Sequence, residues 1–318
     1  DGADWSVAQP LIAQGKLPNL KRLMDRGVYG PMKTFRPTLS PAIWTSIVTG
    51  KKPIKTGIVD FFRLSNSLFF DESLPVVPMT RLVSNIEYIF LTPMNATVRL
   101  AEYGFWDLQA NNRTNRQTKA IWNIVGGLGK KVGTVNFMVT TPAEKINGFM
   151  VTDYLQLQEQ GSPSVTYPST LYNEIKSLQI VDHDVTSKDL EPFFPEPGMA
   201  EQLSKVNKPP HAIYYEVLQQ AYSEDKSSAR YGDYIFKTYR PDLMMFYFHG
   251  PDIISHFFWK YHKPKDFWNV PEKDIKTYGQ MIDRYYMYID ELIKPFVDEL
   301  DNGATIILCS DHGYESIS

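Results

Sequence analysis

The chain of 318 residues has little cysteine, no excess of positive charge and no long hydrophobic run. Its single cysteine, Cys309, excludes an internal disulfide and any metal site built from several cysteines. A net charge of −3 gives no electrostatic support for binding a nucleic-acid polymer. No apolar run approaches the roughly 18 residues that a membrane-spanning helix needs. The length of 318 residues suits one large domain or two modest ones, and 43% apolar residues are enough for a sizeable core.

Short apolar segments alternate with helical patterns along the chain. KKVGTVNFMV, LMMFYF and TIILC are rich in the apolar, β-branched and aromatic residues typical of short buried strands. Helical spacing of apolar residues occurs in four stretches: Val7 to Met24, TKAIWNIVGGLG, IYYEVLQQAY, and Asp274 to Leu300. This alternation predicts an α/β fold with a central, mostly parallel sheet flanked by helices.

Two regions interrupt the alternation. Residues 62–116 mix apolar runs with NNRTNRQ, and residues 154–210 are rich in proline, serine and charge. We expect each region to be an insertion or a cap beside one domain that spans residues 1–318. The chain begins at Asp1 without a methionine and stops after SDHGYESIS, so we expect this domain to be truncated at both ends.

Five hydroxyl side chains are concentrated in RPTLSPAIWTSIVTG, from Arg36 to Gly50. Pro41 suits the first position of a helix, which places Ser40 at the N-cap. In one interpretation Ser40 only caps the helix. In the other, its hydroxyl lies among free N–H groups at the positive end of the helix dipole, where a phosphate can bind. A nucleophilic serine also needs a base or a metal.

Carboxylates and imidazoles follow the predicted strands. Asp252 and His256 come after LMMFYF at a spacing of i and i+4, which puts both on one face of a helix. Asp311 and His312 follow TIILC, and Asp1 opens DGADW at another expected strand end. Parallel sheets place ligands at the carboxyl ends of their strands. This donor set suits zinc, or a harder ion such as manganese.

Together these segments resemble the alkaline phosphatase superfamily, and within it the type I phosphodiesterase/nucleotide pyrophosphatase branch, including its predicted phosphohydrolase or phosphomutase members. The matching segments occur in family order: DGADW, GKLPNLKRLMDRGVYGPM, RPTLSPAIWTSIVTGKKPIKTGIVDF, VNFMVTTPAEKINGFMV, PDIISHFFW and SDHG. The resemblance runs nearly from end to end. It implies an alkaline-phosphatase-like sandwich and one catalytic domain over residues 1–318.

The resemblance also implies a hydrolase of phosphate mono- or diesters that uses two divalent metal ions, with zinc first and manganese as the alternative. Ser40 would be the nucleophile, because it stands six residues before the serine of SIVTG. The implied metal ligands are Asp1, Ser40, Asp252, His256, Asp311 and His312. Asp252 and His256 would hold the second metal with a histidine beyond residue 318. The expected partner is a small phosphate ester.

Several alternatives stay open. Thr38 and Thr45 are weaker candidates for the nucleophile, and His249 or His262 could supply the third ligand of the second metal. Otherwise we expect surface or hydrogen-bonded structural roles for His183, His211, His249 and His262. Phe61 stands where nucleotide pyrophosphatases have an asparagine, which weakens the case for a nucleotide substrate. A phosphomutase, a phospho-group transferase or a non-catalytic binding module on the same fold are the rival functions.

Overall fold

The computed structural model describes residues 1–65, 74–75, 107–153 and 165–316. Its central sheet has four strands in the order β6-β5-β4-β7. β4 (Val132–Phe137) pairs in parallel with both β5 (Gly148–Thr152) and β7 (Leu243–Phe246). The short β6 (Thr166–Tyr167) is antiparallel to β5. A mostly parallel sheet between helices confirms the predicted α/β class.

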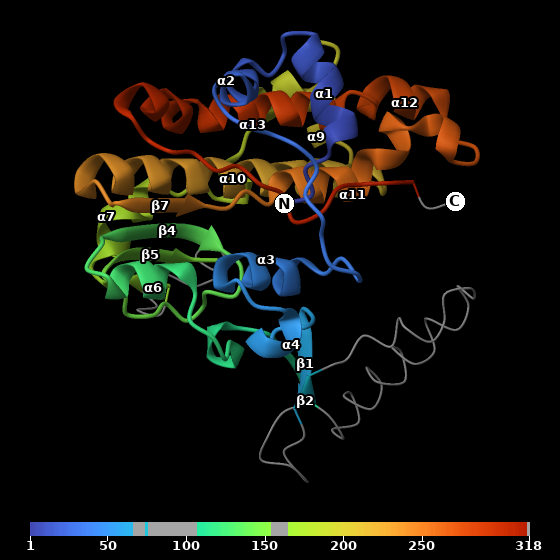
Figure 1. Ribbon diagram of the computed structural model, residues 1–318. Helices are drawn as coiled ribbons and strands as arrows, with labels where there is room; N and C mark the ends of the chain where they lie inside the picture. Colours follow the sequence, from blue (N-terminus) through green and yellow to red (C-terminus); the bar gives the residue numbers. More distant parts are fainter. Residues whose placement is uncertain (66–73, 76–106, 154–164, 317–318) are drawn as a thin grey trace.

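Helices cover both faces of this sheet (Figure 1). The long α10 (His211–Tyr239) lies on one face, and α3 (Ser40–Thr49) and α6 (Ile121–Gly127) lie on the other. Neighbouring residues of β5 show how the layers are joined: Val151 belongs to the core beneath α10, whereas Met150 belongs to the core with α3 and α6. Successive residues of a strand point to opposite faces, so one strand serves both cores.

Two further helices, α11 (Gly250–His262) and α13 (Met281–Val297), pack against α10, and α13 lies on its side away from the sheet (Figure 1). They also contact each other, and they share one aromatic-rich core. The remaining helices are α1 (Trp5–Ala13), α2 (Pro18–Arg26), α4 (Pro53–Thr56), α7 (Leu171–Ile175), α8 (Ser187–Leu190), α9 (Met199–Ser204) and α12 (Glu272–Tyr278). In the described part of the chain, none of the helices has the length and apolar character needed to cross a bilayer.

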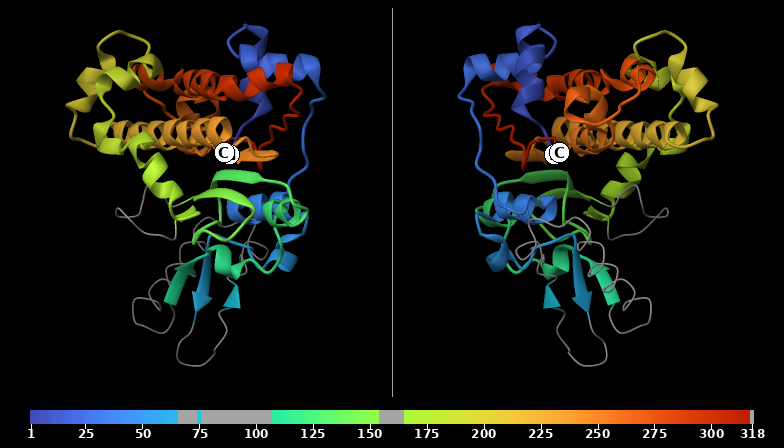
Figure 2. Two further views of the ribbon diagram at one scale, coloured as in Figure 1. Left: turned by 90° about the vertical axis from the view of Figure 1, so that its left-hand side faces the viewer. Right: turned by 90° about the vertical axis from the view of Figure 1, so that its right-hand side faces the viewer.

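Short 3-10 helices join several of these elements: η2 (Arg113–Asn115), η4 (Lys176–Leu178), η5 (Asp182–Asp184), η6 (Glu191–Phe193), η7 (Pro264–Asp266) and η8 (Asp298–Asn302). A second, antiparallel sheet of β2 (Leu74–Pro75), β1 (Phe62–Ser65) and β3 (Asp107–Ala110) projects beyond α4, on the side away from α13 (Figures 1 and 2).

The two predicted insertions are only partly covered by the described residues. Of residues 62–116, the segments 66–73 and 76–106 lie outside them, as do residues 154–164 of the second region. The described remainder of the second region carries α7, α8 and α9, and α9 packs against α10. The assignment of both regions as insertions or caps stays a prediction.

Two details of the prediction are wrong. Ser40 is the first residue of α3 rather than its cap; Leu39 is the cap, and no side chain caps this helix. TIILC does not form a buried strand: residues 304–310 have no regular secondary structure, and Ile307 is 86% exposed. An apolar run becomes a buried strand only when neighbours pair with it and cover it, and none of the described strands pairs with this one.

The contact between α10 and the sheet depends on Gly232. A Cβ added at Gly232 would lie 1.8 Å from the Phe246 ring on β7. We therefore expect Gly232→Ala to lower the free energy of unfolding by about 1–3 kcal/mol, the usual cost of overpacking a core. Gly127→Ala in α6 is the matched control, since its new Cβ meets nothing within 4 Å. Urea titration of both variants checks this, and equal midpoints would contradict it.

Candidate metal centre and active site

Segments from both ends of the chain meet at the start of α11. The amino group of Asp1 donates to the carbonyl of Phe248, 2.8 Å away, just before the helix begins, and Figure 1 shows the first residue beside α11. Ala3 N–H in turn donates to Ser310 Oγ at 2.8 Å. Two close approaches require glycine, because a Cβ at Gly2 would lie 2.8 Å from Asp252 Oδ1 and one at Gly313 would lie 2.1 Å from Asp4 Oδ2.

His312 Nε2 lies at the centre of the resulting group of polar side chains. It is 3.2 Å from Ser40 Oγ and 3.5 Å from Asp1 Oδ1. It is also 3.6 Å from both Asp252 Oδ1 and Asp311 Oδ2. Ser40 Oγ is within 3.4 Å of Asp1 Oδ1. The structure thus brings together five of the six side chains that the sequence singled out.

The sixth side chain, His256, reaches the group through Asp252. Its Nε2 is 3.5 Å from Asp252 Oδ2, as the i and i+4 spacing on α11 requires. Its side chain is 64% exposed, in contrast to the buried carboxylates. The two alternative hydroxyls are placed elsewhere: Thr38 is exposed, and Thr45 is buried within α3.

The three carboxylates around His312 are almost completely buried. Asp1 and Asp252 are each 8% exposed and Asp311 is 1% exposed. Each has an oxygen that accepts a hydrogen bond from the protein: Tyr247 donates to Asp1 Oδ2, Tyr314 donates to Asp252 Oδ1, and Gly2 N–H donates to Asp311 Oδ1. These bonds fix the orientation of the carboxylates. Asp1 Oδ1 accepts a further hydrogen bond from Ser40 Oγ, whereas Asp311 Oδ2 has no hydrogen-bond partner among the described residues.

The two tyrosines are held in their protonated, donating form. Burial, and after it the negative charge of Asp311, raises the pKa of Tyr247 well above its usual value. Burial and the charge of Asp252 raise the pKa of Tyr314 in the same way. The sequence did not indicate Tyr247, because an aromatic residue within the apolar segment LMMFYF is expected in the core. It did not indicate Tyr314 either, because a single tyrosine after SDHG belongs to no recognisable motif.

The donor atoms fit a divalent metal ion. Ligands bound at 2.0–2.2 Å around a tetrahedral zinc lie about 3.3–3.6 Å from one another. The separations from His312 Nε2 to Ser40 Oγ, Asp1 Oδ1 and Asp311 Oδ2 are 3.2, 3.5 and 3.6 Å. Asp311 Oδ2 is buried and has no hydrogen-bond partner among the described residues, so it is available to a cation. Asp1, Asp311 and His312 each offer an atom within 4.8 Å of the others.

A second group of metal-ligating type includes His249. Asp1, His249 and Asp252 also offer atoms within 4.8 Å of one another. His249 Nε2 is 4.0 Å from Asp252 Oδ2, and its Nδ1 is 3.6 Å from Glu224 Oε2 on α10. A carboxylate behind the far nitrogen is the usual way in which a protein orients a metal-binding imidazole. Its only sequence signal is its position three residues before Asp252.

Asp225 fixes the start of α11, which carries these side chains. It is fully buried, and its carboxylate accepts hydrogen bonds from His249 N–H, Gly250 N–H and the Tyr285 hydroxyl. Burial raises its pKa to about 6. Gly250 must be glycine here, because a Cβ would lie 2.0 Å from the Tyr285 hydroxyl. The helix therefore begins at one defined point.

The other histidines lie outside this group. His211 Nδ1 is 2.6 Å from the Tyr278 hydroxyl, and His183 is exposed beside Asp184. His262 Nδ1 faces Asp283 at 3.5 Å, and burial lowers its pKa. These are hydrogen-bonded or surface positions, and none of the three contacts the carboxylate cluster.

A family model described as type I phosphodiesterase / nucleotide pyrophosphatase matches residues 1–318. The chain belongs to this family. The membership confirms the resemblance inferred from the sequence and implies a hydrolase of the phosphodiesterase or pyrophosphatase type. Members of the type I phosphodiesterase family are typically metal-dependent, in keeping with the candidate ligand groups above. No curated protein and no solved structure matches the chain.

Replacing Asp311 should change the stability of the protein in opposite directions without and with a bound metal. With a chelator present, Asp311→Asn should be at least as stable as the unchanged protein, because one like charge leaves the cluster. With zinc at 100 times its dissociation constant, the unchanged protein should gain about 2.7 kcal/mol and the variant clearly less. Urea unfolding with and without zinc measures both. Asp184→Asn, at an exposed site, is the control and should gain as the unchanged protein does. An equal gain in Asp311→Asn would contradict the assignment.

Proposed function

We propose that this chain hydrolyses phosphate mono- or diesters with Ser40 as the nucleophile and two divalent metal ions, zinc first and manganese as the alternative, on an alkaline-phosphatase-like sandwich. The observation that supports this most strongly is the place of Ser40. Its hydroxyl is 3.2 Å from His312 Nε2 and 3.4 Å from Asp1 Oδ1, at the edge of a buried cluster of three carboxylates.

One metal would be held by Asp1, Ser40, Asp311 and His312, and the second by Asp252 and His256. Bound there, the metals would supply Lewis-acid stabilisation of the phosphate charge and a lower pKa for the Ser40 hydroxyl. Ser40 opens α3, so the positive end of this helix also faces the phosphate. Tyr247 and Tyr314 hold Asp1 and Asp252 in their orientation throughout.

In this proposal Ser40 is the residue that forms a covalent bond with the substrate. Its Oγ forms a bond to phosphorus, while the bond from phosphorus to the leaving oxygen breaks and the alcohol departs. Water then attacks the phosphoseryl group, which releases phosphate from a monoester, or a phosphomonoester from a diester, and restores the hydroxyl. Release to water distinguishes a hydrolase from a phosphomutase or phosphotransferase, in which another hydroxyl accepts the group.

We further propose that His249 is the third ligand of the second metal. It is oriented by Glu224, and its Nε2 faces the same oxygen of Asp252 that His256 faces, at 4.0 and 3.5 Å. Three donors from the first turns of one helix would then converge on one ion. A histidine beyond residue 318 is the alternative ligand.

Ser40→Ala should abolish nearly all release of phosphate and leave the fold intact. Because Ser40 does not cap α3, the loss of stability should stay within about 1 kcal/mol. Thr38→Ala, at the exposed hydroxyl two residues earlier, is the control and should keep most of the activity. The assay follows release of phosphate from monoesters, and of the phosphomonoester from diesters, in ¹⁸O-labelled water. Full activity in Ser40→Ala would overturn the assignment, and transfer of the phosphoryl group to an alcohol without a labelled product would favour a transferase.

His249→Ala should weaken the second metal site at least about tenfold, since even residues that only orient a ligand contribute that much. The first site should keep its affinity. Calorimetric titration of zinc into the metal-free protein resolves the two events. His183→Ala, at an exposed histidine outside the cluster, should titrate like the unchanged protein. If His249→Ala also leaves both events unchanged, the second metal takes its third ligand from elsewhere.

A further inference from the structure

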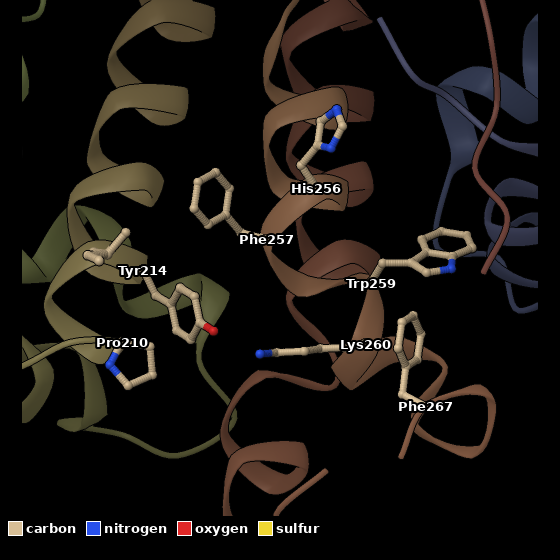
Figure 3. A pocket seen from close by; sticks show the side chains of 8 residues that line it. Pro210, Tyr214, His256, Phe257, Trp259, Lys260 and Phe267 are labelled. Atoms are coloured by element: carbon tan, nitrogen blue, oxygen red, sulfur yellow. The ribbon is translucent and has the colours of Figure 1, made fainter. Parts of the chain in front are cut away.

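A cavity of about 410 Å³ opens on α11 directly beyond His256. Its walls come from the first turn of α10, the middle of α11 and the segment after it (Figure 3). The lining residues are Pro210, Ile213, Tyr214, His256, Phe257, Trp259, Lys260 and Phe267. This volume lies within the range of sites for small molecules. His256 is the residue that the cavity shares with the proposed metal centre.

Side chains spaced four residues apart on α11 lead from the proposed metal centre into the cavity. Asp252, His256 and Lys260 follow at intervals of four residues, so they form one stripe on the helix. Each step advances about 6 Å along the axis. A molecule whose phosphate is bound near Asp252 and His256 can therefore reach Lys260 with a group only about one aromatic ring long.

Lys260 is the only charged side chain in the lining apart from the titratable His256. Its ammonium lies over the rings of Tyr261 and Tyr214, 4.9 and 5.9 Å from their centroids, and Figure 3 shows it directed toward Tyr214. In the described part of the chain no carboxylate forms an ion pair with it. A cationic ligand would be repelled there, whereas an anionic one would find a positioned and unneutralised partner.

The remaining walls are apolar or aromatic. Phe257 and Ile213 are 37% and 42% exposed, so they offer apolar surface to a ligand without a change in the fold. Trp259 is held in place, since its indole N–H donates to Ser316 Oγ at 3.1 Å. Flat apolar groups pack well against such aromatic walls. The cavity thus combines a flat apolar middle with one positive charge at the end.

We propose that this cavity binds the leaving group of the substrate, and that the substrate class is a phosphate ester whose leaving group has a flat apolar part ending in an anionic group that pairs with Lys260. The inference rests on the proposed function, because it takes the phosphate to lie at the metal centre. It excludes esters with a cationic leaving group, such as those of quaternary amines.

The test compares two esters, 4-carboxyphenyl phosphate and phenyl phosphate, with the zinc-loaded full chain. The unchanged protein should prefer the carboxylated ester in kcat/KM. Lys260→Met should reduce this preference about fivefold, the upper end for an exposed ion pair, chiefly through KM. It should leave the turnover of phenyl phosphate unchanged. Lys265→Met, which removes the same charge from an exposed position outside the lining, should keep the full preference.

A second variant and a binding measurement separate the failure of this inference from the failure of the proposed function. Ile213→Glu places a carboxylate in the cavity and should also reduce the preference. Calorimetry with 4-carboxybenzylphosphonate, which cannot be hydrolysed, should show weaker binding to Lys260→Met and unchanged binding to Lys265→Met. If neither ester is hydrolysed but this difference in binding persists, the cavity assignment stands and the proposed function is wrong. An equal effect of both lysine variants, or none, overturns the cavity assignment.

Discussion

The whole arrangement depends on three carboxylates that are kept together out of water. Asp1, Asp252 and Asp311 each lie within 3.6 Å of the same imidazole nitrogen, and all three are buried. Like charges about 4 Å apart repel by roughly 4 kcal/mol at an effective dielectric constant of about 20. Hydrogen bonds from Tyr247 and Tyr314 relieve only part of this. A cation at this place would compensate the remaining charge, and Asp311 Oδ2, which has no hydrogen-bond partner among the described residues, is consistent with one.

Hydrogen bonds and close backbone contacts hold the segments around this cluster in place. Asp225, buried in α10, holds the first N–H groups of α11, so the helix that carries Asp252 starts at one defined point. Gly2 lets the first residues approach Asp252 more closely than any side chain would allow. The rigid layers of sheet and helices therefore place groups from residues 1, 40, 252 and 311 within contact distance. The fold thus arranges this cluster before any ligand binds.

Sequence patterns were informative where the chemistry is local. The i and i+4 spacing of Asp252 and His256 specifies one helical face, and the structure has it; the alternation of apolar segments specified the α/β class. The pattern failed where the outcome depends on distant partners. The pattern of TIILC predicts a buried strand, but much of the segment is exposed. Burial depends on other elements that cover the segment, and a local pattern contains no information about them. Ser40 reads as a cap, yet its hydroxyl is directed to Asp1 and His312, which lie 39 and 272 residues away in the chain.

The most direct test of the central claim is to trap the phosphorylated protein. The zinc-loaded chain is mixed with a phosphate ester, quenched in acid during turnover, digested and mapped by mass spectrometry. We expect phosphate on Ser40, and we expect it to disappear when the unquenched reaction runs to completion. Phosphate on another hydroxyl during turnover would contradict a seryl nucleophile at the carboxylate cluster. The absence of any phosphorylated peptide would also contradict it, provided that the alcohol is released faster than phosphate, so that an intermediate must accumulate.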